Sequence, residues 1–267
     1  MYIVTVYTSS HRWKYLLSLV EGSSGLSSLR LFSLYIMGSF FSRLLPGMVG
    51  GDAVRAYYLY KDTKSGTMAL ASVFADRYMG FAAMLSLGLV ALPFGINKIR
   101  GADAGWTIPL EWIVPLIAFV FIVFSFLIFT LQIGKRFSKV KNLYEYFLKL
   151  KNSPSILIKS FSLSVAVQVI GIFSVYLISV GIGAKTSLIE FFLFVPIINT
   201  ITALPISMSG LGVREGAFVL LLGLTGIKPE VATSISLAWF LAYALGSTPG
   251  IIVYLKWRVK KELQQES

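Results

Sequence analysis

The stretch PGMVGGDAVRAY at residues 46–57 decides how this chain is built, together with PISMSGLGVREGA at residues 205–217. Each interrupts an apolar run, at residues 31–60 and 191–213 respectively. Proline ends a helix because it lacks an N–H and clashes with the preceding turn, and glycine permits backbone conformations that other residues resist. Both stretches therefore predict a helix that stops and restarts inside an apolar region. The predicted break residues are Pro46, Gly47, Gly50 and Gly51 in the first stretch and Pro205, Gly210 and Gly212 in the second.

The composition surrounding these stretches indicates a membrane protein. Of 267 residues, 56% are hydrophobic and 13% are charged, and the mean hydropathy is +0.76. A soluble domain carries roughly 25% charged residues, so half that share cannot cover a water-exposed globule. Lys and Arg outnumber Asp and Glu by 24 to 12, and in so apolar a chain this predicts contact with anionic lipid rather than nucleic acid.

Cysteine is absent and His11 is the single histidine. Disulfides, thiolate chemistry and His or Cys metal clusters are thereby excluded, and we expect neither a metal nor a cofactor.

Four uncharged runs are long enough to cross a bilayer, which takes roughly 20 residues. They lie at residues 78–97, within a helix expected to begin near Met68, and at residues 112–134, 160–184 and 231–255. The apolar run within residues 1–14 is too short to span. We expect residues 11–17 to lie at the membrane interface, with His11 on the surface.

Lysine and arginine predict the orientation, because short cytoplasmic loops are enriched in them. Residues 135–159 hold seven basic residues, and residues 256–261 hold four. Both segments are expected in the cytoplasm, in contact with anionic inner-leaflet lipids, as are the N- and C-termini. Residues 31–60 must then begin and end inside, and residues 188–227 must begin and end outside. Each interrupted run is therefore predicted to be a re-entrant hairpin, and the two enter from opposite faces.

The predicted fold class is an all-α integral membrane protein with inverted repeats, each holding one re-entrant broken-helix hairpin and transmembrane helices. Repeat one covers about residues 29–134 and repeat two about residues 160–256, in a single domain spanning residues 1–267 with a basic linker at residues 135–159. Inverted repeats with broken helices near the midplane are a transporter architecture.

Several polar residues of these segments are candidates for binding an anion. A helix that restarts after a break aims free N–H groups and a positive dipole end into the membrane. In both stretches an arginine follows the proline by nine residues, and its fork of donors suits a phosphate. An acid and a base, Asp76 and Arg77, lie inside an apolar helix, where they are costly unless paired or hydrated. The predicted substrate-binding residues are Arg55, Arg214, Asp52, Asp76, Arg77, Glu215, Ser72 and Asn199.

Neighbouring residues on a helix point about 100° apart, so Asp76 and Arg77 should not pair with each other. Asp76 is expected to pair with Arg55 or Arg214, and Arg77 with a carboxylate such as Asp52. A purely structural ion-pair network explains these charges equally well. Two further aromatic residues at helical spacing, Trp239 and Tyr243, are expected to pack within the bundle rather than to contact a ligand.

Three segments resemble the signatures of the lysylphosphatidylglycerol synthase transmembrane-region family: LPGMVGGDAVRAY at 45–57, ASVFADRYMG at 71–80 and SGLGVREGA at 209–217. The resemblance covers roughly residues 10–258. It implies a flippase-like protein of a prokaryotic cell membrane that moves a phospholipid, with an anionic or aminoacylated head group, or a polyprenyl-phosphate lipid. The aminoacyl-transferring synthase domain of some relatives has no counterpart in these 267 residues.

Two other functions remain open at this stage. The chain could be a membrane transferase acting on polyprenyl-phosphate sugars, with Asp52 or Asp76 binding a metal or acting as base. No acidic pair has the close spacing of a divalent-cation site, which disfavours this alternative. A membrane scaffold with basic loops that recruit a partner would instead tolerate loss of charge at Asp76 and Arg77. A homo-oligomer is also left open.

Overall fold

The computed structural model describes residues 1–20, 22–23, 25–44, 49–100, 112–130, 138–203 and 210–263. These residues form α-helices joined by short connections, and none of them lies in a β-strand. The helices are α1 (Tyr2–Leu17), α2 (Ser28–Leu44), α3 (Val49–Thr63), α4 (Gly66–Arg100), α5 (Ile113–Thr130), α7 (Ser138–Lys151), α8 (Pro154–Gly181), α9 (Leu188–Ala203), α10 (Val213–Gly223), α11 (Pro229–Ser247) and α12 (Pro249–Leu263).

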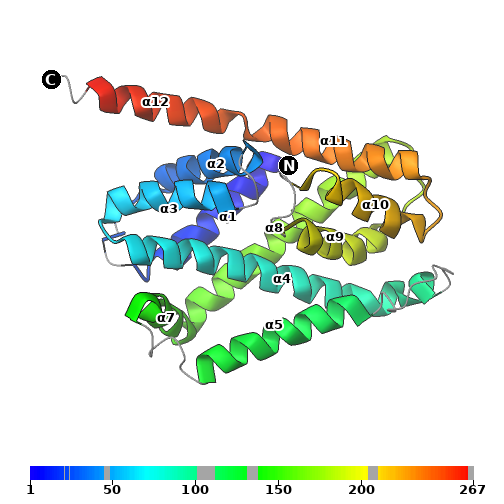
Figure 1. Ribbon diagram of the computed structural model, residues 1–267, viewed down its shortest axis with the longest axis horizontal. Helices are drawn as coiled ribbons and strands as arrows, with labels where there is room; N and C mark the ends of the chain where they lie inside the picture. The colour runs from blue at the N-terminus through cyan, green and yellow to red at the C-terminus, as the bar shows by residue number, and fades with distance from the viewer. Residues whose placement is uncertain are drawn as a thin grey trace.

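The two longest helices, α4 and α8, cross the middle of the molecule and pack against each other (Figure 1). The pair α2–α3 lies beside α1, α4 and α12, and the pair α9–α10 lies beside α4, α8 and α11. Helix α5 follows α4 along one edge, and α11 and α12 run along the opposite edge. The two helix pairs therefore occupy different ends of the bundle, with α4 and α8 between them.

Local sequence explains where several helices begin and end. Helices α8 and α11 each start with a proline at the first position, where the missing N–H has no intrahelical partner to lose. Helix α8 ends at Gly181, and Gly183, two residues beyond, has a φ of +83° that suits glycine. The next N–H, of Ala184, donates to the carbonyl of Ser179 at 3.0 Å and closes the helix end.

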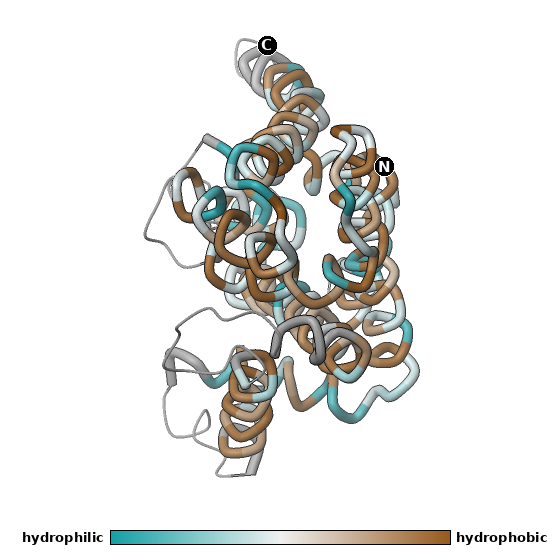
Figure 2. Tube along the Cα trace, turned by 90° about the vertical axis from the view of Figure 1, so that its right-hand side faces the viewer, coloured by the Kyte–Doolittle hydropathy of each residue, from teal (hydrophilic) through white to brown (hydrophobic). Residues whose placement is uncertain are grey.

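Three of the four predicted membrane helices coincide with candidate spans, and the fourth, at residues 112–134, overlaps the shorter apolar helix α5. Three segments are long and apolar enough to cross a bilayer: Gly66–Phe94, Pro154–Gly181 and Pro229–Trp257. Helix α5 contributes a shorter apolar stretch, Val114–Leu127, and its tube is brown along nearly all of its described length, lowest in the view of Figure 2. Large apolar side chains face outward, with Phe119 65% exposed, and this exterior suits lipid rather than water.

The last predicted span is two helices rather than one. Helix α11 ends at Ser247 and α12 begins at Pro249, because that proline cannot continue the hydrogen-bond ladder of the preceding turn.

Each interrupted run forms a hairpin of two helices, α2–α3 and α9–α10, and the members of each pair lie side by side (Figure 1). In the second hairpin, Gly210 and Gly212 lie in the break, with φ values of +79° and +81°, and α10 starts directly after Gly212. Pro46, Gly47 and Pro205 lie outside the described residues. The break in the second hairpin thus uses its two glycines as predicted.

The prediction that Gly50 and Gly51 break the first hairpin is wrong, because α3 begins at Val49 and includes both. Gly51 instead lets α3 approach α2. A Cβ there would overlap the carbonyl oxygen of Gly38 and the hydroxyl of Ser42. A Cβ on Gly38 would lie 2.5 Å from the Cγ of Arg55. These glycines serve close helix packing, the role that small residues have in membrane bundles.

The expectation of an interfacial N-terminal segment is also wrong, because α1 packs inside the bundle. Arg12 is 4% exposed and Trp13 is fully buried, and Trp13 lies in an apolar cluster with residues of α2, α3, α4 and α7. His11 is half-buried rather than exposed, with its ring centroid 4.9 Å from that of Tyr7. The short apolar run of this segment misleads because its polar residues find partners in neighbouring helices.

Helix α7 lies in the basic segment and presents an apolar face to the protein. Tyr146 is fully buried there and donates from its hydroxyl to the carbonyl of Leu16 at 2.9 Å. Burial raises the pKa of the Tyr146 phenol, so it remains a donor at physiological pH. Lys141, Lys149 and Lys151 are exposed, and they leave a basic surface on the outside of this helix.

Candidate functional site

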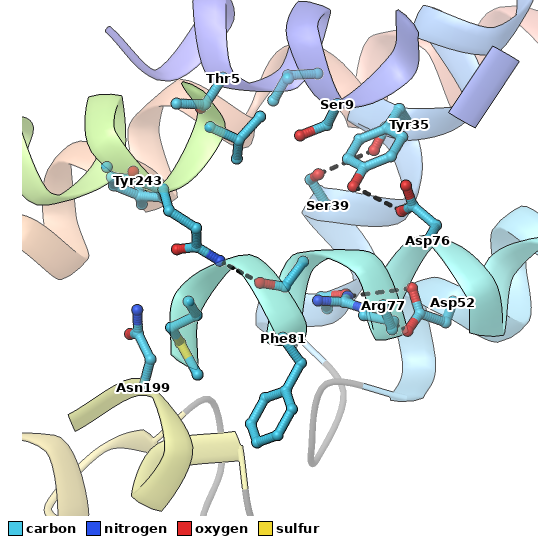
Figure 3. A pocket seen from close by; sticks show the side chains of 18 of the residues that line it. Thr5, Ser9, Tyr35, Ser39, Asp52, Asp76, Arg77, Phe81, Asn199 and Tyr243 are labelled. Carbon is cyan, nitrogen blue, oxygen red and sulfur yellow. Dashed lines mark hydrogen bonds and ion pairs between the residues drawn. The ribbon is translucent and has the colours of Figure 1, made fainter. Parts of the chain in front are cut away.

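A cavity of about 630 Å³ lies between the two hairpins. Residues of α2 and α3 line it from one side and residues of α9 and α10 from the other, and α1, α4, α5, α8 and α11 complete the wall. Figure 3 shows α1 above and α4 below this space, with Asn199 and Tyr243 at the end opposite Asp52 and Asp76. Its volume lies within the range of small-molecule sites, roughly 300–1,000 Å³.

Asp76 of α4 joins three other helices at one end of the cavity. Its carboxylate is fully buried and accepts from Arg12 Nε of α1 at 2.7 Å and from Arg55 Nη1 of α3 at 3.1 Å. The hydroxyl of Tyr35, on α2, donates to the same carboxylate at 3.0 Å (Figure 3). A buried carboxylate is tolerated when it is paired and hydrogen-bonded in this way.

Asp52 continues this series of charges. It accepts from Arg55 Nη2 at 2.9 Å and from Arg77 Nε at 2.7 Å. The charges therefore alternate in the order Arg12, Asp76, Arg55, Asp52, Arg77. The predicted pairs of Asp76 with Arg55 and of Arg77 with Asp52 are confirmed.

Aromatic rings hold Arg55 in this position. Its guanidinium lies 4.2 Å from the ring centroid of Tyr35 and 4.9 Å from that of Trp13. Ser72, predicted to contact substrate, does not line the cavity. It is fully buried and accepts from Nε1 of Trp13 at 3.2 Å. Ser72 thus orients the indole behind Arg55.

The other end of the cavity belongs to α10 and α11. Arg214 is 5% exposed, its Nε donates to the Ser236 hydroxyl at 3.3 Å, and its Nη2 lies 3.5 Å from the Glu215 carboxylate. That Nη2 makes no hydrogen bond to any described residue. Arg214 lines the cavity, and its guanidinium therefore keeps hydrogen-bonding capacity that the described residues do not use.

Glu215 stands behind Arg214 and does not line the cavity. Its carboxylate accepts from the backbone N–H of Gly212 and from the hydroxyl of Ser236. The predicted free N–H at the start of this helix is therefore occupied by a side chain of the same helix, an N-terminal capping arrangement. Glu215, predicted to bind substrate, instead caps α10 and lies 3.5 Å from Arg214, outside the cavity wall.

Arg43, at the end of α2, is a cavity residue that sequence reasoning missed. Its guanidinium lies 5.3 Å from the ring centroid of Tyr243, and no carboxylate among the described residues pairs with it. Arg214 lies over the same stretch of α11, 4.8 Å from the Phe240 ring and 6.0 Å from the Trp239 ring. The rings of Trp239 and Tyr243 are themselves 5.6 Å apart. Two cations from different hairpins thus lie against aromatic rings of the same helix, α11.

The neutral polar residues of the wall include Asn199, as predicted, and Gln168, whose amide donates to the carbonyl of Gly80 at 3.0 Å. Tyr243 and Trp239 also line the cavity. Both also pack within the bundle as expected, Trp239 with its ring centroid 5.9 Å from that of Phe218 and Tyr243 5.1 Å from that of Tyr2.

Arg12 and Tyr35 are further site residues that the sequence did not reveal. Arg12 had a signal in its favour. Thr5, Ser9 and Arg12 follow one another at helical spacing, and all three line the cavity. Such a polar stripe on an otherwise apolar segment predicts a buried polar face. No pattern in the sequence marks Tyr35 as a site residue, because it lies in an apolar run and its only polar side-chain group is a hydroxyl.

The described residues contain no group of three His, Asp or Glu side chains placed to hold a metal. Both carboxylates of the cavity are instead engaged by arginines. The site is thus a helical membrane cavity in which arginines predominate, and its chemistry suits recognition of an anion.

Residues 1–250 match the family described as Lysylphosphatidylglycerol synthase TM region, and the chain belongs to this family. It is also similar to the UPF0104 membrane protein MJ1078 of Methanocaldococcus jannaschii. The two are 26% identical over 209 residues, which cover 76% of this chain and 87% of that relative. No solved structure matches the chain significantly.

Proposed function

We propose that this protein is a lipid transporter whose cavity binds the phosphate of an anionic or head-group-modified phospholipid, or of a polyprenyl-phosphate lipid, during passage across the membrane. The observation that carries the proposal is the excess of arginine in the cavity. Five arginines and two aspartates line it: Arg12, Arg43, Arg55, Arg77 and Arg214, with Asp52 and Asp76. Guanidinium groups present paired donors that match the geometry of a phosphate.

The remainder of the wall supports a lipid rather than a small hydrophilic anion. Apolar side chains from four helices face the same space, among them Val6, Met84, Phe121 and Val195. A head group bound among the arginines would leave its acyl chains in contact with such surfaces. The exterior of the bundle is apolar as well, so a lipid can remain in hydrocarbon as it enters.

The two hairpins give the proposal its geometry. Each supplies an arginine, Arg55 from α3 and Arg214 from α10, that faces one cavity. In the proposed arrangement the hairpins re-enter from opposite faces of the cell membrane as inverted repeats, and both termini lie in the cytoplasm. Rocking of one repeat against the other then exposes the cavity to each leaflet in turn.

The charges favour transport over the transferase alternative. Asp52 and Asp76 would serve as base or metal ligand in that alternative, yet each accepts hydrogen bonds from two arginines. Carboxylate oxygens that already accept these hydrogen bonds have little capacity left for a metal or for a substrate proton. A scaffold would have no need for an arginine-lined cavity.

The proposal is tested by translocation of a fluorescent phosphatidylglycerol in proteoliposomes, followed by quenching from outside. We expect Arg214→Gln and Arg43→Gln each to slow translocation at least about tenfold while the purified proteins remain monodisperse. The matched control is Lys141→Gln, which removes one positive charge from the exposed face of α7, away from the cavity. Wild-type rates in both cavity variants would refute the proposal.

A further inference from the structure

The charges within the cavity point to the class of lipid that it accepts, an inference that rests on the proposed function. Each carboxylate of the wall is already shared between two arginines, Asp76 between Arg12 and Arg55 and Asp52 between Arg55 and Arg77. Glu215 stands behind the wall and faces Arg214. When this third carboxylate is counted, five arginines face three acids, and the site retains a formal charge of +2.

One unit of this excess belongs to the series of three arginines and two aspartates that begins at Arg12 and ends at Arg77. The other unit lies at the end of the cavity formed by Arg43 and Arg214, with Glu215 behind it. Arg43 has no carboxylate partner among the described residues, and the nearly buried Arg214 leaves Nη2 without a hydrogen bond. Both guanidiniums lie over the rings of α11, and Asn199 shares their wall of the cavity. A phosphodiester carries one negative charge and several acceptor oxygens, so it would complete both the charge balance and the hydrogen bonds there.

An ammonium group has no comparable place in this site. A lysine ester on a head group adds two ammonium groups, and each would need an acceptor with negative charge once water is excluded. The carboxylates of the wall are engaged, and displacing one would leave two arginines unpaired. Like charges in a partly buried site repel by several kcal/mol at short range.

We infer that the cavity selects phospholipids with a net negative head group and discriminates against aminoacylated ones, with Arg43 and Arg214 as the pair that contacts the phosphate. Arg55 and Arg77 are then occupied by Asp52 and serve mainly to hold the wall. The selection arises from charge rather than from head-group size, because the cavity is large enough for either head group.

The test measures binding of dioctanoyl lipids to the purified full-length chain in detergent, by the fluorescence of its tryptophans. The lipids are phosphatidylglycerol, phosphatidylethanolamine and lysyl-phosphatidylglycerol, with inorganic phosphate and glycerol 3-phosphate as soluble anions. We expect phosphatidylglycerol to bind at least about tenfold more tightly than lysyl-phosphatidylglycerol, the effect of one charged hydrogen bond. Phosphatidylethanolamine should fall between them.

Variants separate the charge effect from a folding defect. Arg43→Gln should weaken the binding of phosphatidylglycerol about tenfold and reduce the ratio of its affinity to that of lysyl-phosphatidylglycerol. Arg43→Lys should retain most of the affinity and most of that ratio. Lys141→Gln should change neither quantity. Asn199→Asp adds a carboxylate to the same wall. It should therefore increase the affinity for lysyl-phosphatidylglycerol relative to that for phosphatidylglycerol. Thermal unfolding shows which variants fold. If Arg43→Gln does not fold, the binding measured with Asn199→Asp tests the selection instead.

The outcomes are distinct. Equal or tighter binding of lysyl-phosphatidylglycerol would overturn the selection while leaving a lipid-binding cavity in place. Binding of no lipid, or binding of the two soluble anions as tightly as phosphatidylglycerol, would overturn the proposed function itself.

Discussion

Replacing Asp76 by Asn should destabilise the protein strongly, because one carboxylate neutralises two buried arginines. The side chain of Asp76 is fully buried, and those of Arg12 and Arg55 are 5% and 3% exposed. Asparagine keeps the shape but removes the charge, and it leaves Arg12 without a carboxylate and Arg55 with Asp52 alone. Removing one partner of a buried ion pair costs about 3–5 kcal/mol. Asparagine can still accept a hydrogen bond, so we expect about 3 kcal/mol.

The matched control is Asp62→Asn. Asp62 pairs with Arg30 at 3.0 Å, but their side chains are 21% and 30% exposed. Exposed pairs of this kind contribute about 0.2–1 kcal/mol. Both variants make the same chemical change in an Asp–Arg pair, so the difference between them isolates burial.

The assay is reversible unfolding in mixed micelles, with helical circular dichroism as the signal. A double variant, Arg12→Gln with Asp76→Asn, tests the mechanism further, because it removes the charge that the single change leaves unpaired. We expect its loss of stability to be smaller than the sum of the single losses by about 0.5–3 kcal/mol. If Asp76→Asn costs no more than Asp62→Asn, the buried network does not stabilise this fold and the reasoning fails.

Three further changes test the packing by the same unfolding assay. Gly51→Ala should cost about 1–3 kcal/mol because its Cβ would overlap the backbone of Gly38, whereas Gly216→Ala, with open space around it and a helical backbone, should be neutral or stabilising. Tyr146→Phe should cost about 0.5–1.5 kcal/mol, because it removes the hydroxyl's hydrogen bond to the Leu16 carbonyl, which still accepts from the N–H of Leu19 at 3.3 Å. Gly212→Ala should cost about 1–3 kcal/mol through backbone strain alone, since its φ is +81° and no atom lies near its Cβ position. An unchanged free energy of unfolding in any of the three would contradict the contact or conformation assigned there.

Much of the architecture was predictable because it depends on local chemistry. Apolar length located the long helices, and glycine and proline located the two interruptions. Charge in an apolar helix drew attention to Asp76 and Arg77, and helical spacing showed that each needed a partner from elsewhere. The pairing of Arg77 with Asp52 followed from there.

The parts that could not be predicted depend on contacts between distant segments. The polar stripe that includes Arg12 indicates a buried face, but it does not reveal that the partner of Arg12 is Asp76, on another helix. Gly51 was interpreted through backbone freedom, although its function is close approach to α2. Arg43 gave no signal, because an arginine near a helix end is ordinary until the opposite wall is known. Which partner a side chain pairs with depends on the tertiary structure, so the periodicity of the sequence does not predict it.

Native mass spectrometry of the protein purified in mild detergent tests the central claim most directly, because it identifies a bound lipid by its mass. We predict an adduct of an anionic phospholipid or polyprenyl-phosphate lipid on the wild-type chain. That adduct should be lost or strongly reduced in the Arg43→Gln, Arg214→Gln double variant and retained in Lys141→Gln. A wild-type chain that carries no phosphate-bearing lipid, or an adduct equally abundant in the double variant, would contradict the account.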